Sequence, residues 1–88
     1  MNLDQRIAIV TGAGSGIGAA TAEVLAAAGA SVVVTDISEK AAEQTANVIA
    51  QRGQSATALV QDVTSPEQWE QVFEAAKATF GAPNALVN

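Results

Sequence analysis

The sequence contains no cysteine, no histidine and no tyrosine among its 88 residues. Without cysteine there is no disulfide framework, and without cysteine or histidine a transition-metal site would be unusual. Without histidine there is no base for a hydrolase triad. We therefore expect no metal site and a cytoplasmic location, because a reducing compartment is the simplest home for such a chain.

Positive charge is also scarce, with four Lys and Arg residues against nine Asp and Glu, a net charge of -5 and a pI of about 4.3. The four cations are scattered along the chain at Arg6, Lys40, Arg52 and Lys77. Nucleic acid and anionic membrane surfaces are therefore not expected as partners. No apolar run approaches the roughly 18 residues of a membrane span, and the first residues, MNLDQR, lack the pattern of a signal peptide.

Apolar residues are abundant, at 49% of the chain, and they fall into two alternating patterns. Short, nearly continuous apolar runs cover 7–10, 32–34, 56–60 and 85–87. Such runs are typical of strands that are covered on both faces, and helical spacing separates them. The alternation predicts a single α/β domain over 1–88, with a parallel sheet and right-handed crossovers.

Three helices are predicted between these strands, each with an apolar face at three- and four-residue spacing. For the first helix the spacing predicts an inner face made of Ile17, Ala20, Thr21, Val24, Leu25 and Ala28. The second helix, over 38–52, is predicted to turn inward Ala42, Thr45, Ala46 and Ile49. The third carries Trp69, Val72, Phe73, Ala76 and Phe80, and opens with Ser65 as N-cap and Pro66 at its first position.

The loop between the first strand and the first helix reads TGAGSGIG, over 11–18, and holds four of the seven glycines. If the strand ends at Val10 and the helix opens at 16–18, the first-turn N–H groups lack partners and attract an anion. Gly12, Gly16 and Gly18 would then serve the tight turn, the close approach of a pyrophosphate, and helix-on-strand packing. A plain strand-to-helix turn is the alternative interpretation.

Asp36 lies 18 residues beyond Gly18, where the second strand ends. A carboxylate there can accept hydrogen bonds from both hydroxyls of an adenosine ribose, although it could also be an ordinary loop acid. A 2′-phosphate at 4 Å would be repelled by about 4 kcal/mol per pair of unit charges at an effective dielectric of 20. Only Lys40 is near in sequence to offset this, so the cofactor predicted is NAD rather than NADP.

These residues resemble the short-chain dehydrogenase/reductase family, whose signature Thr-Gly-x-x-x-Gly-x-Gly is matched by Thr11, Gly12, Gly16 and Gly18. The resemblance implies a Rossmann-type doubly wound parallel sheet, here a truncated one with strand order 3-2-1-4. It also implies a set of cofactor-binding residues, with Ser15 and Ile17 at the phosphate and ribose region, Asp36 and Ile37 on the adenosine side, and Asp62 and Val63 at the adenine ring. Asp62 could instead be a simple turn former. Asn88 matches the first asparagine of the family's Asn-Asn-Ala-Gly motif.

The resemblance also implies residues that this chain does not contain. The family's catalytic Ser and Tyr-x-x-x-Lys pair are absent, so no catalytic residue is assigned and the isolated chain is expected to be inactive. Two interpretations stay open: the NAD-binding part of an oxidoreductase that transfers hydride between NAD and an alcohol or carbonyl, and a non-catalytic nucleotide-binding or self-associating module. A fourth strand at the edge of the sheet would favour self-association or a C-terminal half that covers it.

Overall fold

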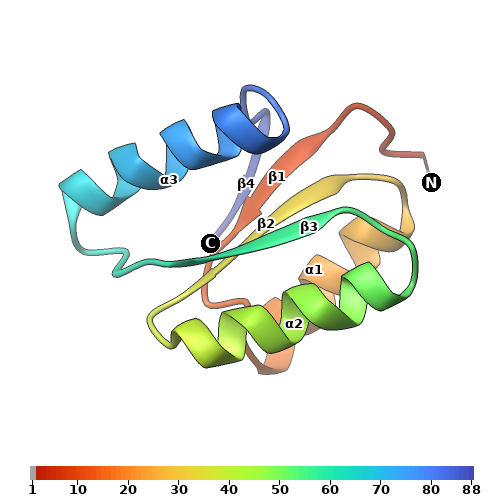
Figure 1. The fold of residues 1–88 in the computed structure, drawn as a ribbon, viewed down its shortest axis with the longest axis horizontal. Coiled ribbons are helices and arrows are strands. Elements are labelled where there is room, and N and C mark those ends of the chain that lie inside the picture. Colours follow the sequence, from red (N-terminus) through yellow and green to blue (C-terminus); the bar gives the residue numbers. More distant parts are fainter. Residues whose placement is uncertain (1) are drawn as a thin grey trace.

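The computed structural model describes residues 2–88 as three helices alternating with four strands (Figure 1). In chain order the elements are β1 (Ile7–Val10), α1 (Gly16–Ala27), β2 (Ser31–Asp36), α2 (Glu39–Gln51), β3 (Ala56–Val60), α3 (Pro66–Thr79) and β4 (Ala85–Val87). The strand–helix alternation predicted from the sequence is confirmed. None of the helices within 2–88 is long and apolar enough to cross a membrane.

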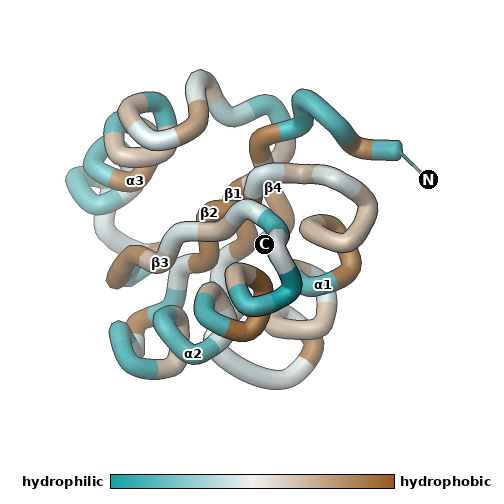
Figure 2. The backbone as a smooth tube through the Cα atoms, turned by 45° about the vertical axis from the view of Figure 1, so that its right-hand side comes forward, coloured by the Kyte–Doolittle hydropathy of each residue, from teal (hydrophilic) through white to brown (hydrophobic). Residues whose placement is uncertain are grey.

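The four strands form one parallel sheet in the order β3-β2-β1-β4, as expected for a Rossmann-type fold. In this register Ile9 of β1 lies between Val33 of β2 and Leu86 of β4. Helices α1 and α2 lie on one face of the sheet and α3 lies on the other (Figure 1). The strands at the centre of the molecule are its most hydrophobic part, whereas α2 and α3 carry hydrophilic residues on their outer turns (Figure 2).

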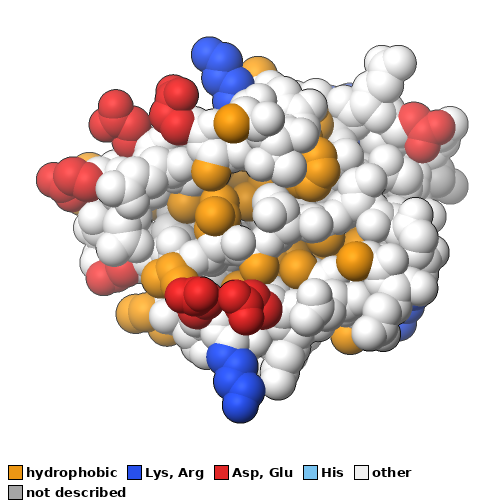
Figure 3. Space-filling model, viewed as in Figure 1, with side chains coloured by type: hydrophobic (Ala, Val, Ile, Leu, Met, Phe, Trp, Pro, Cys, Tyr) orange, Lys and Arg blue, Asp and Glu red, His pale blue; other side chains and the backbone are white. Residues whose placement is uncertain are grey.

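Alternate residues of the strands supply two separate cores, one on each face. The larger core joins Val10, Val32 and Val34 to buried residues of α1 and α2. The smaller one joins Ile9 and Val33 to Val72 and Ala76 of α3, with Leu59, Trp69 and Phe80 partly buried around them. The α3 face is the less well covered, and hydrophobic side chains reach the surface between α3 and α2 (Figure 3).

The predicted inner face of α1 is wrong. The buried residues of this helix are Ala22 and Ala26, whereas Ile17 is 88% exposed and Val24 is 58% exposed. Glu23 is the only charged residue in α1, so apolar residues occupy every side of the helix and their spacing does not identify the buried one. Ala22 and Ala26 pack into the larger core against the strands, and Ile17 and Val24 are left on the surface.

The other two helices follow their predicted patterns. The four residues predicted on the inner face of α2 are all buried, and Ser38 caps the helix by accepting a 3.2 Å hydrogen bond from the Ala41 N–H. Ser65 caps α3 in the same way, through the Gln68 N–H at 3.3 Å. Phe73 is the exception in α3, because 42% of it remains exposed.

Candidate functional site

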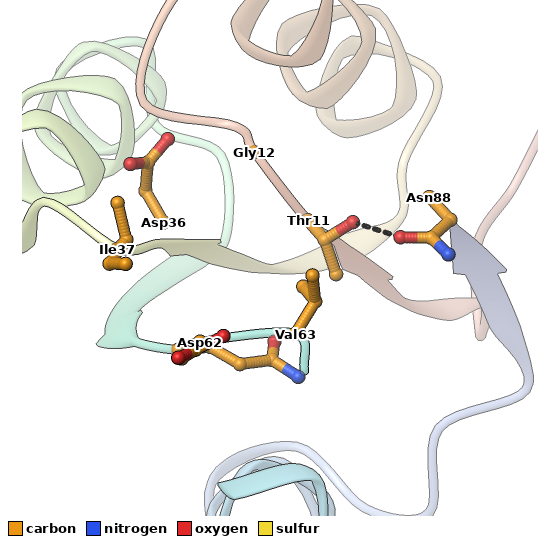
Figure 4. Close-up of a pocket in the computed structure, with 8 residues that line it drawn as sticks. Thr11, Gly12, Asp36, Ile37, Asp62, Val63 and Asn88 are labelled. Carbon is orange, nitrogen blue, oxygen red and sulfur yellow. Dashed lines mark hydrogen bonds between the residues drawn. The ribbon is translucent and has the colours of Figure 1, made fainter. Parts of the chain in front are cut away.

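The candidate site lies at the carboxyl ends of the four parallel strands, where the loops after β1, β2 and β3 meet the end of β4. A cavity of about 400 Å³ opens there (Figure 4). Its lining residues come from all four strand ends and are Thr11, Gly12, Asp36, Ile37, Gln61, Asp62, Val63 and Asn88. From β1 the chain adds β2 and β3 on one side of the sheet and then β4 on the other side. Ligands of open parallel sheets bind at such a switch point.

The glycine-rich loop has the backbone geometry that its sequence predicts. Gly12 and Gly16 have φ angles of 60° and 61°, in the left-handed region that favours glycine, and a Cβ at either position would meet nothing within 4 Å. Gly18 differs, because a Cβ there would overlap the carbonyl oxygen of Gly12. Gly12 thus has the backbone conformation of a tight turn, Gly16 leaves open space beside the loop, and Gly18 packs closely on the backbone of Gly12 and Ala13. The approach of a pyrophosphate at Gly16 stays a prediction.

Helix α1 begins at Gly16, directly after this loop. Its N-cap residue Ser15 makes no side-chain capping hydrogen bond, unlike Ser38 and Ser65 at the starts of α2 and α3. The Ser15 side chain therefore does not occupy the N–H groups at the start of α1, where the helix dipole adds partial positive charge. The loop can hold an anion without help from a cationic side chain.

Thr11 ties the loop to the neighbouring strand. Its Oγ1 donates a 2.7 Å hydrogen bond to Oδ1 of Asn88, and its N–H donates to the Val87 carbonyl at 3.0 Å (Figure 4). Thr11 is 8% exposed, so these bonds lie within the structure at the floor of the cavity. Thr11 therefore has a structural role, and it holds Asn88 at the cavity's β4 side.

Asp36 stands at the end of β2, with its carboxylate turned toward the glycine-rich loop (Figure 4). Oδ2 accepts a hydrogen bond from the Gly14 N–H at 3.0 Å, and Oδ1 accepts one from the Ser38 N–H at 2.9 Å. Its neighbour Ile37 is 74% exposed and presents an apolar surface at the same edge of the cavity. The carboxylate therefore has structural partners in addition to its place in the cavity wall.

Asp62 and Val63 form the opposite wall, after β3. Oδ1 of Asp62 accepts hydrogen bonds from the Thr64 hydroxyl at 2.6 Å and from the Thr64 N–H at 2.9 Å. The hydroxyl and then the N–H hold the pKa of the Asp62 carboxyl below its usual value, because both bonds favour the charged form. Asp62 thus forms a turn with Thr64, as one of its two interpretations predicted. It is also one of the residues that line the cavity.

Gln61 is a cavity residue that the sequence interpretation missed. It is only 2% exposed, and neither its Oε1 nor its Nε2 has a hydrogen-bond partner within the described part of the chain. A buried amide without a partner costs about 1–3 kcal/mol, which makes Gln61 an unusual side chain at this place. The available signal was a polar residue directly after the apolar run of β3 and directly before Asp62.

The ten residues predicted to bind a cofactor fall into two neighbouring groups. Six of them line the cavity, namely Gly12, Asp36, Ile37, Asp62, Val63 and Asn88. The other four, Ser15, Gly16, Ile17 and Gly18, lie at the end of the glycine-rich loop and the start of α1. Within residues 2–88 no group of His, Cys, Asp and Glu side chains is arranged to hold a metal ion.

Comparison with known proteins identifies the family. The sequence matches the short chain dehydrogenase family over residues 6–88. This chain therefore belongs to the short-chain dehydrogenase family.

Individual relatives agree with this assignment. The 3-oxoacyl-(acyl-carrier-protein) reductase FabG of Escherichia coli is 43% identical over 88 residues, which are all of this chain and 35% of the relative. The 7alpha-hydroxysteroid dehydrogenase of Escherichia coli is 42% identical over 88 residues, which are 34% of its length. The chain thus spans about a third of the length of these curated relatives.

Solved structures show the same fold. A hydroxysteroid dehydrogenase from Escherichia coli matches 99% of this chain with a TM-score of 0.96 and 42% identity, over 37% of its own length. A 7alpha-hydroxysteroid dehydrogenase in complex with NADH and 7-oxo glycochenodeoxycholic acid matches 99% of this chain with a TM-score of 0.95 and 42% identity, over 34% of its own length. The sheet described above is accordingly part of a Rossmann fold.

Proposed function

We propose that this chain binds NAD(H) as the cofactor-binding part of a short-chain dehydrogenase/reductase-type oxidoreductase. The observation that carries the proposal is a glycine-rich loop with open space at Gly12 and Gly16, followed by a helix whose N-cap makes no side-chain hydrogen bond. Beside this loop lies a cavity with Asp36 in its wall. The similar dehydrogenase structure that contains NADH supports the same ligand class. Bound NAD would supply the hydride chemistry, and the residues of this chain would bind and orient the cofactor.

Each part of the dinucleotide has a proposed set of residues. The pyrophosphate would lie against the loop and the first turn of α1, formed by Gly12, Ser15, Gly16, Ile17 and Gly18. Asp36 would accept hydrogen bonds from the ribose hydroxyls, because each of its oxygens retains a second acceptor site. The adenine would lie between the exposed side chains of Ile37 and Val63, with Asp62 accepting from its amino group, and Asn88 would bound the site on the β4 side.

NAD is proposed over NADP because of the charges around Asp36. A 2′-phosphate would approach this carboxylate, and the nearest cation in sequence is Lys40 in α2, while Arg52 is paired with Glu23 at 3.0 Å. The repulsion of about 4 kcal/mol at 4 Å is reduced by salt, so we expect NADH to bind at least about tenfold more tightly than NADPH. Parallel calorimetric titrations with the two reduced cofactors test this, and equal affinities would contradict it.

The reaction proposed for the whole protein is hydride transfer between NAD and an alcohol or carbonyl substrate. This chain contains no tyrosine, so it cannot provide the family's tyrosine proton donor, and we propose that it has no activity alone. Incubation with NADH and a panel of ketones, followed at 340 nm, should give no oxidation above the blank. Turnover by the purified chain would contradict this proposal.

A cytoplasmic location is proposed for the same protein, and cell fractionation tests it.

A second candidate is a non-catalytic nucleotide-binding module that self-associates. Two surfaces favour it. Within residues 2–88, β4 pairs with β1 alone, which leaves its other edge open. The exposed Ile17 and Val24 of α1 line an apolar groove of about 290 Å³ together with the half-buried Leu25. Helices that are apolar on all sides are normally covered on more than one side, and open strand edges pair readily. Sedimentation over a range of concentrations tests this, and a sharp monomer with a cooperative thermal transition would exclude it.

A further inference from the structure

Asp36 makes a contact that links the end of β2 to the middle of the glycine-rich loop. Its Oδ2 accepts the Gly14 N–H at 3.0 Å across 22 residues of sequence, and its Oδ1 accepts the Ser38 N–H at 2.9 Å. Gly14 occupies a position that the Thr-Gly-x-x-x-Gly-x-Gly signature leaves open. Hydrogen bonds from N–H groups to a carboxylate are stronger than neutral ones, so this contact can hold a backbone segment in place.

The loop is also in close contact with α2 at Gly14. A Cβ on Gly14 would lie 2.5 Å from Cβ of Ala41 and 2.9 Å from Oδ2 of Asp36, which is too close for any side chain. The preceding residue, Ala13, donates its N–H to the Thr35 carbonyl at 2.9 Å. The first half of the loop is therefore attached to β2 by one backbone bond and one carboxylate bond, and it packs against the first turn of α2.

We infer that Asp36 is a positioning residue for the glycine-rich loop, and that the loop binds a diphosphate more tightly because this carboxylate holds Gly14. The inference rests on the proposed function, which already gives Asp36 a contact with ribose. It adds that the affinity for the diphosphate depends on Asp36 even when the nucleotide has no ribose hydroxyls. Loop geometry and cofactor preference are thus coupled through one side chain.

The experiment compares ADP with 2′,3′-dideoxy-ADP, which lacks both ribose hydroxyls. Asp36→Ala removes both carboxylate oxygens, so the Gly14 N–H and the Ser38 N–H both lose their acceptor. We expect this variant to bind dideoxy-ADP at least about tenfold more weakly than the wild type. We also expect faster hydrogen exchange at the Gly14 amide in the ligand-free variant.

The matched control is Glu39→Gln, which removes one negative charge from the first turn of α2. It should leave both the dideoxy-ADP affinity and the Gly14 exchange rate unchanged. If Asp36→Ala weakens ADP binding alone and leaves dideoxy-ADP binding and Gly14 exchange as in the wild type, Asp36 is a ribose acceptor only and the inference is wrong. If the wild type binds neither nucleotide, the proposed function fails, while Gly14 exchange still decides whether Asp36 holds the loop.

A second pair of variants tests the loop with Asp36 intact. In Gly14→Ala the new Cβ would meet Ala41 and should push the loop away from α2, reducing dideoxy-ADP affinity at least about tenfold. Adding Ala41→Gly removes the Cβ at 2.5 Å and should recover a measurable part of that affinity. Wild-type binding by Gly14→Ala, or no recovery in the double variant, would overturn the inference.

Discussion

Gly18→Ala is the most informative single change in the glycine-rich loop, because two physical effects predict opposite signs for it. Gly18 lies in the first turn of α1, and alanine in a helix is favoured over glycine by about 1 kcal/mol. Helix propensity alone therefore predicts a more stable protein. The packing around Gly18 predicts the reverse.

The structure decides which effect is larger. A Cβ on Gly18 would overlap the carbonyl oxygen of Gly12 and lie 2.8 Å from its carbonyl carbon and 3.0 Å from Cα of Ala13. All three are backbone atoms, which cannot rotate away as a side chain could. Overpacking of this kind costs about 1–3 kcal/mol, so after the helix-propensity gain of about 1 kcal/mol we expect the free energy of unfolding to fall by up to about 2 kcal/mol.

Urea denaturation followed by far-UV circular dichroism measures this change, and a titration with NADH measures its effect on the loop. We expect NADH affinity to fall by at least about tenfold, because relief of the overlap must move the turn at Gly12. Gly53→Ala is the control: Gly53 has a φ of 75° and nothing near its Cβ, so that variant should lose about 1 kcal/mol of stability and retain binding. A Gly18→Ala protein that is more stable than the wild type, or that binds NADH equally well, would refute the reasoning.

Three further predictions follow from the contacts of the site and the core. Thr11→Val removes the hydroxyl that donates to Asn88, and in urea denaturation it should lower the free energy of unfolding by about 0.5–1.5 kcal/mol. Thr11→Ser keeps a hydroxyl, so its free energy of unfolding should stay close to that of the wild type. Ile49→Ala, at a fully buried position of α2, should cost about 2–5 kcal/mol in the same assay, and a loss below 1 kcal/mol would contradict the packing described. Hydrogen bonds from Thr64 lower the pKa of the Asp62 carboxyl in the folded protein. The ionised carboxylate therefore stabilises the folded protein above the unfolded-state pKa of about 3.9, and this stabilisation is lost as the pH falls through the lower folded-state pKa. An NMR titration of the Asp62 carboxyl carbon with a midpoint at or above 3.8 would contradict this, and Asp62→Asn should lack that part of the acid dependence.

The sequence alone determined the parallel sheet, the helices and the edge of the sheet at which the predicted residues meet. The apolar runs that became β1 to β4 are local patterns, and so are the Ser38 and Ser65 caps and the glycines of the loop. Local patterns report backbone conformation directly, because helical and strand periodicities and capping hydrogen bonds involve residues close in the chain. With the strands parallel, their carboxyl ends meet at one edge, which brought Asp36 and Asp62 to the same cavity.

Tertiary structure decided what depends on contacts between distant residues. The buried side of α1 is the one on which Ala22 and Ala26 pack into the larger core, and the spacing of a helix with apolar residues on every side cannot reveal it. The burial of Gln61 depends on the chain segments folded around it, and the bond between Gly14 and Asp36 joins residues 22 positions apart. These features arise from packing and from hydrogen bonds across the fold, and local sequence carries no periodic signal for either.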